Sequence, residues 1–169
     1  MELNTVFQYL SHYGIAFIFI IIFLEYLNMP GLAAAIVMPA VGIWCSQSNI
    51  NLILVIFVSS IAGVIASCIL YFLGLYFGDF FINKYLSKYP KQKQFIEEKV
   101  KYIREKGNKG VFISRFIPAI RTLISMPAGL LKLNFAKFIT YSFIAIIIYN
   151  GAFISAGYFL GYGVFKIIG

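Results

Sequence analysis

Charged residues are scarce in this sequence. Asp, Glu, Lys and Arg make up 12% of its 169 residues, and hydrophobic residues make up 61%. An ordinary soluble domain has about 25% charged and about 45–50% apolar residues. Roughly 18 apolar residues in a row suffice for a spanning helix, and segments 50–77 and 138–165 are two uncharged runs of equal length that exceed this. The composition therefore predicts one compact integral membrane domain over residues 1–169, without room for a separate soluble module.

Groups that could bind metals or attack a substrate are also scarce. His12 is the single histidine, and Cys45 and Cys68 lie in or beside apolar segments without metal-ligand spacing. A Gly-rich phosphate loop and a Ser-His-Asp set are both missing, and Ser114 and Ser125 have no candidate base. We therefore expect no metal, no cofactor and no enzymatic activity.

Lysine and arginine are missing from the first half of the chain. Apart from His12, the first basic residue is Lys84. The N-terminal segment lacks the positive region of a signal peptide, so segment 14–24 is expected to belong to the mature protein. Nine of the fourteen basic residues lie in segment 79–109, which the positive-inside rule places in the cytoplasm. Because this linker joins membrane segments, anionic lipid headgroups are its expected partner, and nucleic acid is not.

The same linker carries a helical pattern. Its apolar residues Phe95, Ile96, Val100 and Ile103 recur at helical spacing, while Pro90 suits a helix start and Gly107 suits a helix stop. The pattern predicts an amphipathic helix in the cytoplasmic interface. The alternative is a solvated charged connector.

Two further apolar blocks are interrupted by proline. Glu25, segment 28–31 (NMPG) and Pro39 interrupt the first, and prolines 118 and 127 interrupt segment 111–131. Proline breaks or kinks helices, and irregular backbone at membrane depth must be buried in protein or line a cavity. We therefore expect broken or re-entrant segments at both places. The expected broken-helix positions are Pro30, Gly31, Pro118, Pro127 and Gly129.

Each half of the chain thus has the same order, an interrupted segment followed by a long apolar helix. The fold class predicted is an all-α membrane protein with two inverted repeats, 14–77 and 110–166, joined by the basic linker 78–109. In secondary transporters built this way, the interrupted segments form the substrate site near the bilayer midplane.

Two arginines lie inside the second interrupted block. On a helix that starts at Gly110, Arg115 and Arg121 would be roughly 8 and 16 Å deep, and an arginine at the bilayer centre costs at least about 2.5–3.5 kcal/mol. Guanidinium groups suit bidentate recognition of phosphate, and helix N-termini at broken segments add donors. The pair predicts a site for the phosphate of a lipid. Alternatively, Arg115 extends to the interface and Arg121 pairs structurally with Glu25.

Glu25 is the opposite charge in the first half of the chain. A carboxylate within the membrane is a candidate proton-coupling group, because its protonation depends on burial and on nearby cations. An ion pair with Arg115 or Arg121 is the alternative role.

The stretch GNKGVFISRFIPAIRTLISMPAGLLKLNFAKF, residues 107–138, resembles the central signature of the DedA family, also called the VTT-domain or SNARE-associated Golgi protein superfamily. The family hallmark F-x-x-R-F-x-P-x-x-R-T, followed by P-A-G, is matched at Arg115, Phe116, Pro118, Arg121, Thr122, Pro127, Ala128 and Gly129. The family's Y-x-x-G-x-x-x-G is matched at Tyr71, Gly74 and Gly78, and its later Gly-Tyr segment at Gly157, Tyr158 and Gly161.

The resemblance implies a multi-pass lipid transporter of the bacterial cytoplasmic membrane that returns undecaprenyl phosphate across the bilayer, driven by the proton-motive force. It also implies that Arg115, Arg121 and Glu25 are essential. Other relatives move phosphatidylethanolamine or scramble phospholipids, so a phospholipid flippase or scramblase is an alternative, and a non-transporting scaffold is another. A homo-oligomer is left open.

The sequence departs from the family pattern in two places. The family usually reads E-N-x-G-x-P-G-L-P-G-E where this chain reads EYLNMPGLAAA, so Ala33, Ala34 and Ala35 replace the second acid and its Pro-Gly. This departure leaves proton coupling open. The chain also ends at Gly169, where relatives commonly add a further hydrophobic helix, so a short member or a truncated sequence is expected.

Overall fold

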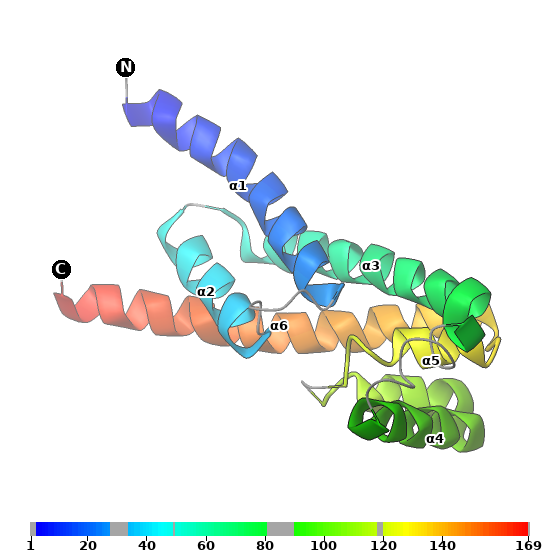
Figure 1. Cartoon of the computed structure of the whole chain (residues 1–169). Coiled ribbons are helices and arrows are strands. Elements are labelled where there is room, and N and C mark those ends of the chain that lie inside the picture. The colour runs from blue at the N-terminus through cyan, green and yellow to red at the C-terminus, as the bar shows by residue number, and fades with distance from the viewer. Residues whose placement is uncertain (1–2, 28–33, 49, 81–89, 118–119, 169) are drawn as a thin grey trace. The chain divides into compact units, whose positions relative to one another are not determined.

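The computed structural model describes residues 3–27, 34–48, 50–80, 90–117 and 120–168. All regular structure in these ranges is α-helical (Figure 1), which confirms the predicted all-α class. The helices are α1 (Leu3–Tyr26), α2 (Ala34–Gln47), α3 (Leu52–Phe80), α4 (Pro90–Ser114), α5 (Ser125–Leu130) and α6 (Phe135–Ile168).

Helices α3 and α6 are long and apolar enough to span a membrane, over 52–78 and 135–161. Their starts have a local cause, because each follows an asparagine cap that satisfies a free backbone donor. The Asn51 side-chain oxygen accepts the Ile53 N–H at 2.8 Å, and the Asn134 oxygen accepts the Lys137 N–H at 3.0 Å. The two predicted spanning runs, 50–77 and 138–165, are thus confirmed as helices. In the structure these helices extend over 52–80 and 135–168.

The chain divides into two compact units, and α3 and α6 contribute to both of them. Unit 1 consists of Met1–Gly63 and Ile146–Gly169, and unit 2 consists of Val64–Ala145. Unit 1 therefore holds α1, α2, the start of α3 and the end of α6. Unit 2 holds the end of α3, α4, α5 and the start of α6.

Helix α4 of unit 2 begins at Pro90, as the linker pattern predicts. Gly107 has φ 58° and ψ −142°, so the helix is interrupted there by a conformation that glycine adopts without a steric penalty. Ile103 is completely buried, whereas Arg104 is exposed, which fits the predicted amphipathic face. The side chains of Phe95, Ile96 and Val100 lie outside the described residues.

The second interrupted block is broken in the structure. Helix α4 ends at Ser114, the described residues from Arg115 to Ile124 form turns, and α5 has only six residues. Pro118 lies outside the described residues. Pro127 and Gly129 are buried inside α5, where Pro127 occupies the first turn and removes an N–H that has no intrahelical acceptor.

The first interrupted block is described from Ala34 onward, so Pro30 and Gly31 lie outside the described residues. Pro39 is inside helix α2, which continues through it to Gln47. The break expected at this proline is therefore not seen in the described part of the block.

In unit 2, α5 packs closely against α3. A methyl group at Gly129 would overlap the carbonyl oxygen of Tyr71, and one at Gly74 would overlap the carbonyl oxygen of Met126. The Tyr71 hydroxyl also donates to the Leu133 carbonyl oxygen. Apolar residues from α3, α4, α5 and α6 then form the core of this unit, including Ile103, Val111, Ile124, Ala128 and Phe138.

In unit 1, α2 packs against α6 in the same manner. A methyl group at Gly42 would overlap the carbonyl oxygen of Ile154, and one at Gly157 would overlap the carbonyl oxygen of Pro39. Helix α1 contacts α2 as well. The ring of Tyr26 lies over Gly63 of α3, where a side chain would displace it.

Candidate functional site

Arg115 is enclosed by unit 2, with 1% of its surface exposed. Its Nε donates to Ser142 Oγ at 3.1 Å, and one terminal nitrogen donates to Ser142 Oγ at 2.8 Å and Ser125 Oγ at 3.1 Å. The other terminal nitrogen donates to Ser67 Oγ at 3.2 Å and to the Arg121 carbonyl oxygen at 3.3 Å. An arginine carries five N–H donors, so each of them has an acceptor within the unit.

These acceptors come from four parts of unit 2. Ser67 lies in α3, Ser125 begins α5, Ser142 lies in α6, and the Arg121 carbonyl belongs to the turn before α5. The guanidinium carbon also lies 5.6 Å from the centre of the Phe138 ring, a cation–π distance. Arg115 therefore ties three helices to the turn and does not extend to the surface.

Arg121 is equally buried, with 1% of its surface exposed. Its backbone N–H donates to the Ile117 carbonyl oxygen at 3.0 Å, and its own carbonyl accepts the bond from Arg115. The neighbouring Thr122 is buried too. The structure thus brings the backbone of one predicted site residue to the guanidinium of the other, in an irregular segment where Arg121 and Thr122 are buried while Phe116 and Ile117 are exposed.

Glu25, the third predicted site residue, belongs to unit 1, where it is 4% exposed near the end of α1. Beside it, the Tyr26 hydroxyl donates to Asn150 Oδ1 at 2.9 Å, and Asn150 Nδ2 donates to Ser59 Oγ at 3.3 Å. Beside Glu25, unit 1 therefore also holds a chain of hydrogen bonds between uncharged groups of α1, α6 and α3.

Several polar residues at these centres were missed by the sequence predictions: Tyr26, Ser59, Ser67, Ser142 and Asn150. Each lies within a strongly apolar helix. Polar side chains in such helices face other helices or cavities and hydrogen-bond across them. That rule could have marked them, but the sequence could not say which of them meet.

The part of the chain that the structure describes holds no group of three or more His, Cys, Asp or Glu side chains able to bind a metal ion. Cys45 and Cys68 are both free thiols. Arg115 and the serines that it contacts therefore form a cationic, hydroxyl-rich centre buried among apolar helices.

Comparison with known proteins places the chain in a family. The model of the VTT domain matches residues 29–159, which include both arginines. The chain belongs to the VTT-domain family. The VTT domain thus covers α2 to most of α6, and Glu25 lies four residues before the matched region.

Three bacterial proteins are among the relatives of this chain. The chain is 30% identical over 155 residues to the uncharacterized membrane protein YkoX of Bacillus subtilis, covering 92% of this chain and 66% of that protein. It is 34% identical over 126 residues to undecaprenyl phosphate transporter A of Bacillus subtilis, covering 75% of this chain and 64% of that protein.

The third relative is undecaprenyl phosphate transporter A of Staphylococcus aureus, which is 28% identical over 154 residues, covering 89% of this chain and 75% of that protein. The chain spans just under two thirds of the length of the first two relatives. No solved structure matches it. The family match and these relatives confirm a DedA-family membrane protein.

Proposed function

We propose that this protein moves a lipid that bears a phosphate group across the bacterial cytoplasmic membrane, and that undecaprenyl phosphate is the lipid. Two relatives carry this transport activity in their names, at 34% and 28% identity. The observation that carries the proposal is the burial of two arginines, Arg115 and Arg121, on the irregular segment that precedes α5.

A buried guanidinium is costly within a membrane, so its presence calls for a reason. On an insertion scale, an arginine at the bilayer centre costs about 2.5–3.5 kcal/mol. A phosphate offers both the opposite charge and the geometry that a guanidinium fork matches. The rest of a carrier lipid is apolar, as are the helices around these arginines.

We propose that both arginines provide positive charge for the phosphate. Because every N–H donor of Arg115 already has a protein acceptor, a direct phosphate bond by Arg115 would require release of a serine or of the Arg121 carbonyl. Arg121 supplies the second buried positive charge, on the turn whose carbonyl Arg115 holds. Arg115 would add positive charge and hold the turn that carries Arg121.

We also infer that the two halves of the chain are inverted repeats with re-entrant segments. In unit 2, Gly74 of α3 faces the carbonyl of Met126, three residues before Gly129 of α5, and Gly129 faces the carbonyl of Tyr71, three residues before Gly74. In unit 1, Gly157 of α6 and Gly42 of α2 are related in the same way, through the carbonyls of Pro39 and Ile154. A constant shift of 83 positions relates Gly74 to Gly157, Gly78 to Gly161, and the cap Asn51 to Asn134.

The burial pattern follows the same shift. Each residue that is buried in the described part of α6 corresponds to a buried residue of α3. The unit boundaries, after Gly63 and after Ala145, follow the shift to within one position. These regularities support a repeat in which the short helix of each half packs on the long helix of the other, a plan typical of secondary transporters.

For Glu25 we propose proton coupling, with an ion pair as the alternative role. Its burial in α1 makes its protonation sensitive to the surroundings. Ala33–Ala35 stand where the family usually has a second acid, so Glu25 would act without that partner. For helix α4 we propose contact with anionic headgroups, through its exposed basic residues Lys101, Arg104, Lys106 and Lys109.

Transport is favoured over catalysis by what the hydroxyl groups do. Ser125 and Ser142, which a hydrolase could use as nucleophiles, accept hydrogen bonds from the Arg115 guanidinium. They are thereby held as acceptors that orient a cation.

Reconstituted vesicles test the proposal. Purified protein would be placed in liposomes with a fluorescent polyprenyl phosphate, and the fraction of label reached by an external quencher would be followed with time. Arg121→Ala should slow the exchange of label about tenfold or more, because a hydrogen bond to a charged group contributes about 1.5–3 kcal/mol. Arg121→Lys should keep part of the rate, since the charge remains.

The matched control is Arg104→Ala, which removes an exposed arginine of α4 and should leave the rate near that of the parent. Parent-like transport by Arg121→Ala would refute the assigned site. Equal transport of labelled phosphatidylethanolamine, insensitive to a pH gradient, would support the flippase or scramblase instead.

A further inference from the structure

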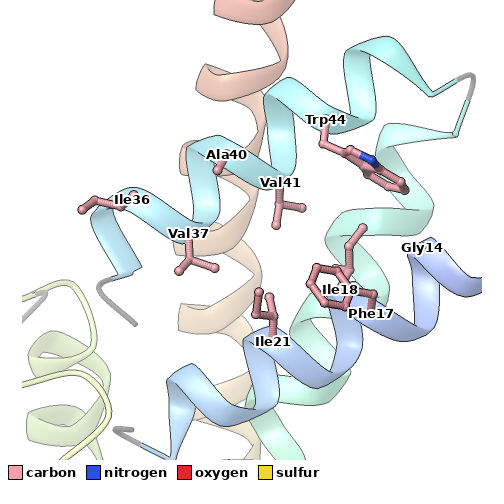
Figure 2. Close-up of a pocket in the computed structure, with 9 residues that line it drawn as sticks. All are labelled: Gly14, Phe17, Ile18, Ile21, Ile36, Val37, Ala40, Val41 and Trp44. Atoms are coloured by element: carbon pink, nitrogen blue, oxygen red, sulfur yellow. The ribbon is translucent and has the colours of Figure 1, made fainter. Parts of the chain in front are cut away.

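Unit 1 contains a pocket between helices α1 and α2. Its volume is about 290 Å³. Figure 2 shows Ile21 of α1 pointing toward Val37 and Val41 of α2. The residues that line it are Gly14, Phe17, Ile18, Ile21, Ile36, Val37, Ala40, Val41 and Trp44.

The chemistry of the lining restricts what the pocket can hold. All nine residues are apolar apart from the indole N–H of Trp44, and a buried water needs two to four polar partners. An empty cavity is also unfavourable, because its lining loses van der Waals contacts. The occupant that suits this lining is a hydrocarbon.

The pocket opens toward the surroundings of the protein. Phe17 and Ile36 line it and are 63% and 72% exposed, and in a membrane protein such apolar surface faces lipid chains. The opposite wall depends on Gly14, since a methyl group there would collide with the ring of Trp44. The small residue lets the indole lie against α1 and close one end of the pocket.

We propose that this pocket binds one hydrocarbon chain of a lipid. At about 30 Å³ for a group the size of a water molecule, the volume accommodates roughly ten carbon atoms, which is a segment of an acyl or polyprenyl chain. The chain could come from a bilayer phospholipid or from the transported lipid. Its assignment to the polyprenyl tail rests on the proposed function, whereas hydrocarbon binding does not.

Trp44 lines the pocket and is the single tryptophan of the chain, so all tryptophan fluorescence comes from this position. Bromine atoms on a lipid chain quench tryptophan on contact. One set of nanodiscs would contain a trace of phosphatidylcholine with brominated acyl chains, and a second set would contain a trace of brominated polyprenyl phosphate. The parent protein should be quenched in at least one set.

Ala40→Phe fills the pocket from its exposed rim and should reduce quenching at least threefold, and Val37→Phe should do the same from inside. Ala152→Phe introduces the same side chain at an exposed position of α6, away from the pocket. The Trp44 fluorescence of this variant should be quenched as in the parent. An unchanged Trp44 emission maximum would show that the indole keeps its place in each variant.

The outcomes separate the two lipid sources. Quenching by the polyprenyl lipid at trace amounts identifies the transported tail, and quenching by phosphatidylcholine alone identifies a bilayer acyl chain. Quenching in neither set, or equal quenching of the parent, Ala40→Phe and Val37→Phe, would overturn the proposal. Hydrocarbon binding and transport are measured separately, so quenching of the parent by brominated phosphatidylcholine would stand even if the transport proposal fails.

Discussion

The hydrogen bonds that join the two long helices differ in charge between the units. In unit 2, Ser67 of α3 and Ser142 of α6 accept hydrogen bonds from Arg115. The shift of 83 positions relates these two serines to Asn150 and Ser59 of unit 1, which bond to each other directly. Unit 1 thus joins its two long helices with neutral groups, where unit 2 uses a cation.

This difference indicates why a charge is present at all. Replacing a buried ionic group by neutral residues is often neutral or stabilising, and unit 1 joins equivalent helix positions without a charge. Helix packing therefore does not require Arg115. We infer that its charge serves the substrate, and the following predictions test or refine this comparison from the largest expected effect to the smallest.

The largest effect is expected at Arg115. Arg115→Ala leaves three serine hydroxyls and the Arg121 carbonyl without their donor, so unfolding in detergent micelles should become easier by about 3–5 kcal/mol. Arg115→Gln keeps amide donors and should retain more of the stability, yet slow polyprenyl phosphate transport about tenfold or more. Parent-like transport by Arg115→Gln would show that the charge has no functional role.

The next effect concerns the close helix contacts, which are alike in the two units. Gly129→Ala in unit 2 and Gly42→Ala in unit 1 each force a methyl group into a backbone carbonyl, and overpacking of this kind costs about 1–3 kcal/mol. Thermal unfolding of the purified protein would measure both. Gly163→Ala, which meets open space, is the control. Loss of stability in only one of the two units would break the proposed equivalence.

A smaller effect is expected at the neutral centre of unit 1. Tyr26→Phe removes the hydrogen bond to Asn150 and should cost about 1 kcal/mol of unfolding free energy. A double-mutant cycle with Asn150→Ala should give a coupling energy of similar size. Additive effects of the two substitutions would mean that this hydrogen bond does not stabilise the folded unit.

The smallest effect per residue is expected at the surface of α4. This helix of unit 2 is rich in Lys and Arg, whereas α1 of unit 1 has none. Anionic lipids in nanodiscs should therefore slow amide hydrogen exchange in α4 but not in α1. Neutralising Lys101 or Lys106 should weaken the protection about fivefold, the equivalent of about 1 kcal/mol per basic residue. Equal protection of α1 and α4 would contradict the charge argument.

Much of the fold could be predicted because it depends on local rules. The long apolar runs became α3 and α6, Pro90 began a helix, and Gly107 interrupted one. The break after Ser114 followed from proline and from an irregular, charged stretch. The expected break at Pro39 was not seen, because a proline within an apolar helix can be accommodated when neighbouring groups satisfy the freed carbonyl.

The candidate site was predicted less completely. The sequence marked Arg115 and Arg121, since charge within an apolar block is conspicuous, and the structure finds both buried. It did not mark Ser67 or Ser142, because serine is common and its role depends on which residues it contacts. The hydrogen bonds of Arg115 were likewise out of reach, since they depend on which acceptors lie near its guanidinium group.

The sequence by itself determined that this protein is a helical membrane protein of the VTT-domain family, because composition, apolar run length and the motif around Arg115 are properties of the chain alone. Only the tertiary structure decided that Arg115 is held by Ser67, Ser125 and Ser142, and that Gly129 contacts the backbone of α3. These pairings join residues far apart in the sequence, and hydrogen bonds and close packing depend on separation in space.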